Sequence, residues 1–155
     1  MNVSLTDEAR KQSIVSMSRS RWLAAVPLVG LIYLVSGLVF GTLAGSAANN
    51  QMKTAWRLAA WLISAAAFAA HIGYENIRLR SSPRMTAFHV CLAVGLGGFG
   101  LAVAASLHSR GTQHHFPASA LAIWPIATAV PAFLVAWAVA ALLTRIDLRD
   151  NTRQL

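Results

Sequence analysis

Apolar residues gather in four long runs that are separated by short polar connections. The runs cover residues 23–45, 55–74, 85–107 and 120–143. A helix needs about 20 mostly apolar residues to cross the hydrocarbon core of a bilayer, and each run has about that length. Lipid offers no water to satisfy backbone N–H and C=O groups, so each run is expected to be helical. The pattern predicts an all-α integral membrane protein with four spans.

The connections between the runs are short, which makes consecutive helices antiparallel neighbours. We therefore expect an up-down-up-down four-helix bundle. Ser82 and Pro83 predict the start of the third helix, as its N-cap and first residue. Three regions result: an N-terminal tail, one transmembrane domain and a C-terminal tail, over residues 1–21, 22–145 and 146–155. The first tail mixes apolar and charged residues, and either an interfacial helix or disorder fits that mixture.

Basic residues are distributed unequally between the two sides of the predicted bundle. Of the 13 Lys and Arg residues, three would lie on one side and the other ten on the side of both termini. The three are Lys53, Arg57 and Arg110. Cytoplasmic loops carry the excess of Lys and Arg, so this asymmetry predicts that both termini are cytoplasmic. The first run is too long for the apolar region of a cleaved signal peptide, so we expect it to remain as an anchor.

Composition agrees with a membrane protein and excludes some other classes. Hydrophobic residues make up 56% of the chain and charged residues 12%, about half of the usual share for a soluble domain. The net charge of +8 does not indicate nucleic-acid binding, because the basic residues flank the spans and suit lipid headgroups. Cys91 is the only cysteine, so an intramolecular disulfide is impossible. The preference for Arg over Lys and the abundance of Ala suggest a bacterial inner membrane.

Small residues line one face of several spans and predict close helix packing, which in lipid depends on small side chains. The first span repeats glycine at every fourth position, and the third has a similar face. The helix-packing candidates are Gly37, Gly41, Gly45, Gly95 and Gly98. Two interpretations remain open: packing within one four-helix bundle, or assembly into a homo-oligomer or larger membrane complex.

The second span carries the polar groups that are most suggestive of function. Ser64, His71 and Glu75 share one helical face, and the side chains of His71 and Glu75 can meet because they are four residues apart. Ionisable groups inside a membrane are expensive and are functional candidates by default. A His–Glu pair can bind or release a proton near neutral pH. In the structural alternative, Glu75 pairs with Arg78 or Arg80 at the headgroups.

Two further groups of histidines suggest cofactors or metals. His89 enters the third span at the depth of His71, and two such imidazoles can ligate a b-type haem or hold a quinone. His108, His114 and His115 lie close together in the last connection, and imidazole is a common ligand of zinc, copper and nickel. In the structural alternatives, His89 donates a hydrogen bond to a backbone carbonyl or a headgroup, and the histidines of the last connection lie in a solvated loop.

Catalysis has little support, because the spans contain no aspartate and Glu75 is the only acidic residue near them. The first interpretation is therefore a non-enzymatic protein, either a small carrier or an assembly subunit that works through its helix grooves. In a carrier, His71 and Glu75 would couple to protons, Ser64 would line the solute path, and Pro125 and Pro131 would flex. The alternative is a redox subunit that binds haem or quinone through His71 and His89.

Overall fold

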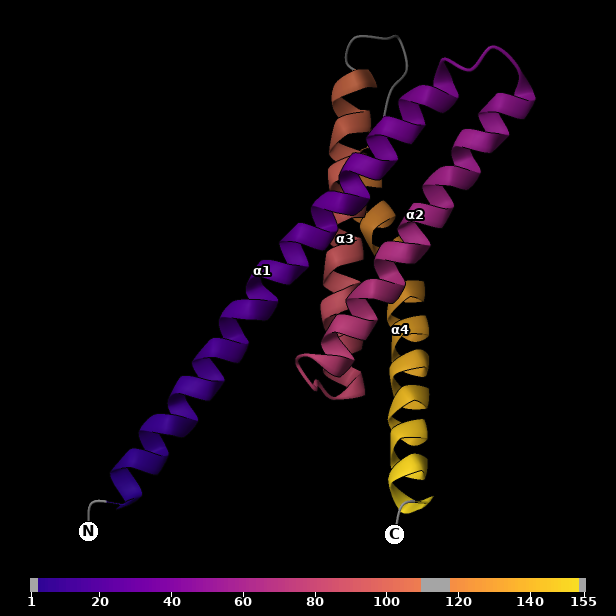
Figure 1. The fold of residues 1–155 in the computed structure, drawn as a ribbon. Coiled ribbons are helices and arrows are strands. Elements are labelled where there is room, and N and C mark those ends of the chain that lie inside the picture. The colour runs from indigo at the N-terminus through magenta and orange to yellow at the C-terminus, as the bar shows by residue number, and fades with distance from the viewer. Residues whose placement is uncertain (1–2, 110–117, 154–155) are drawn as a thin grey trace.

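The protein is a set of four helices in a computed structural model, which describes the backbone of residues 3–109 and 118–153 and the side chains of residues 23–109 and 118–146. The helices are α1 (Val3–Gly45), α2 (Asn50–Ile77), α3 (Pro83–Ser109) and α4 (Ala120–Arg153). No strand occurs in this described part. Along the chain the helices run alternately up and down, and both termini lie at the same end (Figure 1). The predicted all-α fold of four helices is confirmed.

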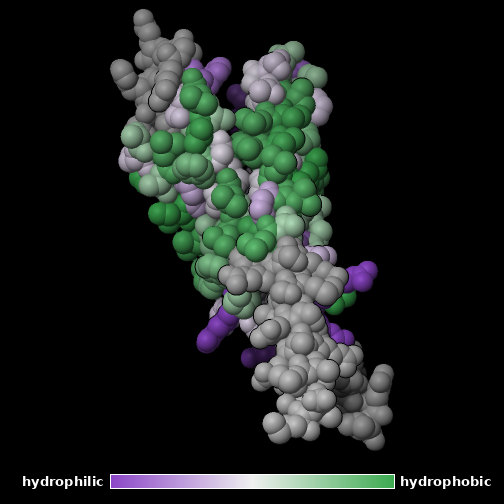
Figure 2. Space-filling view, turned by 90° about the vertical axis from the view of Figure 1, so that its left-hand side faces the viewer, coloured by the Kyte–Doolittle hydropathy of each residue, from purple (hydrophilic) through white to green (hydrophobic). Residues whose placement is uncertain are grey.

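Each helix contains a segment long and apolar enough to cross a membrane. These segments are Leu23–Gly45, Asn50–Ile77, Pro83–Ser109 and Ala120–Ile146, close to the predicted spans. Figure 2 shows green, apolar atoms over the middle of one face and purple, hydrophilic atoms mainly toward its ends. Large apolar side chains point outward on all four helices, as lipid contact requires. The protein is therefore a multi-pass membrane protein by the length, composition and surface of its helices.

Helices α1 and α4 continue well beyond their apolar segments. With 43 residues, α1 is about 65 Å long at 1.5 Å per residue, roughly twice the thickness of the hydrocarbon core. Both helices extend past the α2–α3 connection at the end where the termini lie (Figure 1). The first tail is thus a helical continuation of α1 from Val3 onward. Its location in the cytoplasm stays a prediction.

Local side-chain bonds mark the starts of two helices. The side chain of Asn49 accepts a hydrogen bond of 2.8 Å from the backbone N–H of Met52 at the start of α2. The hydroxyl of Ser82 accepts one of 3.4 Å from the N–H of Met85, and Pro83 is the first residue of α3. The predicted N-cap of the third helix is confirmed, because a serine can satisfy a free N–H of the first turn.

Helix α3 packs between α1 and α4, whose backbones do not approach each other closely in the described part of the chain. Its glycines allow α3 to approach both helices closely. A Cβ on Gly97 would lie 2.6 Å from the Cβ of Tyr33 on α1 and 3.1 Å from the backbone oxygen of Gly30. On the other side, a Cβ on Gly98 would lie 2.7 Å from the hydroxyl of Thr128 on α4. Only glycine fits at these two crossings.

The predicted packing glycines differ in what they face. Gly95 and Gly98 lie against α4, and Gly37 lies beside the flexible side chain of Leu101. Gly41 and Gly45 have open space where a side chain would start. Within one molecule these two glycines therefore leave an unfilled groove, and a role in assembly with other chains stays a prediction.

Candidate functional site

The candidate site lies beside a small hydrophobic core at the end of the molecule where the termini lie. That core joins Ile72 of α2, Ala87 and Val90 of α3, and Ala136 of α4. One turn after Ile72 along α2, the side chain of Glu75 is fully buried, with 0% of its surface exposed. A buried carboxylate is costly unless other groups compensate its charge. The groups around Glu75 therefore determine how its charge is compensated.

Ser81 compensates one oxygen of the Glu75 carboxylate, and the turn after α2 makes this contact possible. The hydroxyl of Ser81 donates a hydrogen bond of 2.8 Å to Oε2 of Glu75. Its backbone N–H also donates one of 3.2 Å to the backbone oxygen of Glu75. Between them, Arg80 has a φ of 47°, in the left-handed region that is uncommon for residues other than glycine. This turn brings the chain back over the end of α2.

Two histidines face the other carboxylate oxygen, Oε1. Nδ1 of His89, on α3, lies 3.0 Å from it, and Nε2 of His71, on α2, lies 3.8 Å from it. An ionised carboxylate only accepts hydrogen bonds, so the Nδ1–H of His89 donates to it in that state. The distance to His71 is too long for a hydrogen bond but short enough for an ion pair when His71 is protonated. We call these four residues, His71, Glu75, Ser81 and His89, the Glu75 cluster.

Two buried polar side chains, His71 of the cluster and Thr86 of α3, have no hydrogen-bond partner among the described residues. His71 is 3% exposed and Thr86, one turn before His89 on α3, is 0% exposed. Neither ring nitrogen of His71, nor the hydroxyl of Thr86, has a hydrogen-bond partner among the described residues. Buried polar groups are nearly always paired, with protein or with ordered water. His71 therefore keeps donor and acceptor capacity beside the carboxylate of Glu75.

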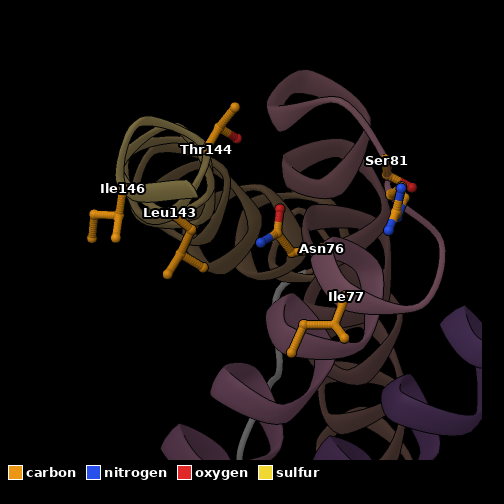
Figure 3. A pocket seen from close by; sticks show the side chains of 7 residues that line it. Asn76, Ile77, Ser81, Leu143, Thr144 and Ile146 are labelled. Carbon is orange, nitrogen blue, oxygen red and sulfur yellow. The ribbon is translucent and has the colours of Figure 1, made fainter. Parts of the chain in front are cut away.

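A cavity of about 590 Å³ reaches the cluster from the end of the molecule where the termini lie. Asn76 and Ile77 of α2, Ser81, and Leu143 and Thr144 of α4 line it, and Asn76 extends from α2 toward α4 (Figure 3). Ser81 thus borders the cavity and also bonds Glu75. It is the link between an open, partly polar space and the buried carboxylate.

The structure brings three of the predicted polar residues together, namely His71, Glu75 and His89. His71 and Glu75 meet as their spacing predicted. Ser64 is half-buried and lies seven residues before His71, about 10 Å away along the axis of α2. His89 faces Glu75. Sequence reasoning identified the shared depth of His71 and His89 but missed this contact and that of Ser81. The shared depth was the signal for His89, since residues at one depth on neighbouring helices can meet.

In the described part of the chain, the candidate metal ligands are not gathered into a site, and the candidate haem ligands face a carboxylate. His114 and His115 lie outside the described residues, and His108 is exposed near the end of α3. Among the described residues, no group of three or more His, Cys, Asp or Glu side chains is arranged to hold a metal ion. Nε2 of His71 and Nδ1 of His89 instead both face Oε1 of Glu75, at 3.8 Å and 3.0 Å. The two rings therefore face a carboxylate with which they can share a proton.

Comparison with protein-family models, with curated proteins and with solved structures finds no match for this chain. The functional argument therefore depends on the geometry of the Glu75 cluster.

Proposed function

We propose that this protein is a small proton-coupled membrane carrier in which Glu75 exchanges the proton. One observation carries the proposal: in an otherwise apolar helical protein, a fully buried carboxylate contacts two imidazoles and a serine that borders a cavity. Ionisable groups buried in membrane helices are costly, and they are functional candidates because proton relays and substrate paths use them.

The proton would reach the site from the cavity, at the oxygen that Ser81 contacts. Protonation of Glu75 removes its negative charge and weakens its bonds to Ser81 and His89, because charge-assisted hydrogen bonds are the stronger ones. Helix α2 has only sparse contacts with α3 and α4. The bonds of Glu75 are therefore an important part of what holds this end of α2 to α3.

The bonds of Glu75 between α2 and α3 offer a physical basis for coupling proton binding to solute movement. In the charged state, the Glu75 cluster holds α2 against α3, and in the neutral state α2 can separate from it. Pro125 and Pro131 interrupt the hydrogen-bond ladder of α4, which makes that helix the one expected to flex. The solute would then move along the face of α2 that carries Ser64.

The test is a pH jump across liposomes that contain the purified protein, adsorbed on a solid-supported membrane. Proton binding at a buried site produces a transient current without any knowledge of the solute. We expect the wild-type current to fall to the level of empty liposomes in Glu75→Gln, and to persist in Glu8→Gln. The second variant makes the same chemical change in the N-terminal extension of α1.

A folded Glu75→Gln protein that gives the wild-type current would contradict the proposal. A current indistinguishable from empty liposomes in the wild type, together with reduced stability of Glu75→Gln, would make the cluster a structural link. That result would favour an assembly subunit, the other non-enzymatic interpretation.

The haem interpretation has its own test. An absorption spectrum of the detergent-purified protein, before and after dithionite, would show a Soret band that shifts on reduction if His71 and His89 bind haem. Because both rings face Oε1 of Glu75, we expect a featureless spectrum after expression with ample haem supply.

A further inference from the structure

A second cavity lies near the start of α2, far from the Glu75 cluster. It has a volume of about 830 Å³, within the range of about 300–1,000 Å³ that is usual for small-molecule pockets. Gly41 and Gly45 of α1 line one side, and Lys53, Arg57 and Trp61 of α2 line the other. We call this cavity the α1–α2 groove.

We propose that the α1–α2 groove binds one anionic phospholipid, with its phosphate at Lys53 and Arg57 and an acyl chain along Gly41 and Gly45. The site is independent of the proton-carrier proposal, because no residue is shared between them.

No acidic side chain in the described part of the chain lies near the two cations of the groove. Lys53 and Arg57 are four residues apart on α2, so they share one side of the helix, and both are exposed. Glu75 is the one acidic residue whose side chain the structure describes, and it is 18 residues beyond Arg57, about 27 Å along the helix. Near a span end, such basic residues meet lipid phosphates.

The floor of the groove has room for an acyl chain. A Cβ added at Gly41 or at Gly45 would meet no atom within 4 Å, so no side chain of the described protein fills this space. Trp61 and Trp124, which also line the groove, are exposed aromatic residues of the kind found at membrane interfaces. The groove therefore joins a cationic end to an apolar, unfilled surface, which matches the two parts of a phospholipid.

A second copy of this chain fits the groove less well than a lipid does. A symmetric contact through the groove would bring Lys53 and Arg57 of one copy near the same residues of the other. The chain carries a net charge of +8, and its one described acidic side chain is buried in the Glu75 cluster. Charge complementarity thus selects an anionic lipid over a homodimer.

Tryptophan quenching by brominated lipids tests the proposal directly. A reporter protein with Trp22→Phe, Trp56→Phe and Trp137→Phe keeps only the two tryptophans of the groove. In nanodiscs of phosphatidylcholine, we expect a small fraction of brominated phosphatidylglycerol to quench at least twofold more than the same fraction of brominated phosphatidylcholine.

Variants of the reporter assign the effect to the groove. Lys53→Gln with Arg57→Gln should abolish the preference for the anionic lipid. Arg84→Gln with Arg145→Gln, which removes the same charge near the other end of the spans, should retain it. Gly41→Leu with Gly45→Leu should lower quenching by both lipids, and the open space at these positions lets that variant fold.

Three results would overturn the proposal. The first is equal quenching by the two lipids in the reporter protein, and the second is an equal loss of preference in both charge variants. The third is efficient disulfide formation between copies of Gly41→Cys in a Cys91→Ser background, since a second chain would then occupy the groove.

Discussion

Glu75 keeps its carboxylate buried because three neighbouring side chains face it, each from a different part of the chain. Removing water from an ion costs several kcal/mol in a protein interior, even after relaxation. Hydrogen bonds to charged groups each return about 1.5–3 kcal/mol. At the scale of single residues, the cost of burying the carboxylate and the stabilisation from its hydrogen bonds are therefore similar. Removal of any one contact should change the free energy of unfolding measurably.

Ser81→Ala should lower the free energy of unfolding by about 1.5–3 kcal/mol, because it removes a hydrogen bond to a buried charged group. Unfolding in detergent by titration with SDS measures this change. Ser46→Ala is the matched control, since Ser46 is exposed and its hydroxyl donates only to backbone oxygens in the last turn of α1. An equal loss in both variants would show that the Ser81 bond has no special weight.

The two histidines should contribute unequally to stability. His89→Leu breaks a contact of 3.0 Å to Glu75 and should cost about 3–5 kcal/mol, as is usual when one partner of a buried pair is removed. His71→Leu loses only a contact of 3.8 Å and a pair of unsatisfied nitrogens, so its cost should be well under half of that. The same SDS titration compares them, and the reverse order would be inconsistent with this geometry.

At the scale of helices, substitution of glycine should have opposite effects at Gly97 and Gly41, although both lie in apolar spans. Gly97→Ala places a Cβ 2.6 Å from the Cβ of Tyr33, so α1 and α3 must separate, at a cost of about 1–3 kcal/mol. Gly41→Ala meets nothing and should be neutral or stabilising by up to about 1 kcal/mol, since alanine is the better helix former. Thermal unfolding in detergent measures the direction of the stability change in both variants. A destabilising effect of Gly41→Ala would contradict the open groove.

At the scale of the whole molecule, four antiparallel helices place both termini on one side of the membrane, and the basic residues predict that side to be the cytoplasm. Cys91→Ser gives a background without cysteine. In intact cells, an impermeant maleimide should label Ala48→Cys and should label Asn151→Cys only after permeabilisation. The opposite pattern would invert the predicted orientation.

Much of this protein follows from local sequence. The four helices, the N-cap at Ser82 and the meeting of His71 with Glu75 each depend on residues close together in the chain. Apolar length, a capping hydroxyl and four-residue spacing act within one helix, where geometry is regular. These features could be predicted because no distant contact is needed to produce them.

Tertiary structure decided the rest. Only the crossing of α3 with its neighbours places His89 against Glu75, and only the left-handed turn at Arg80 brings Ser81 back over α2. The same holds for glycine: Gly97 is confined by α1, whereas Gly41 faces an open groove. Helical periodicity defines the face on which a residue lies, but the arrangement of whole helices determines what that face meets. Lipid tails are as apolar as leucine, so hydrophobicity alone does not separate lipid-facing from protein-facing surfaces.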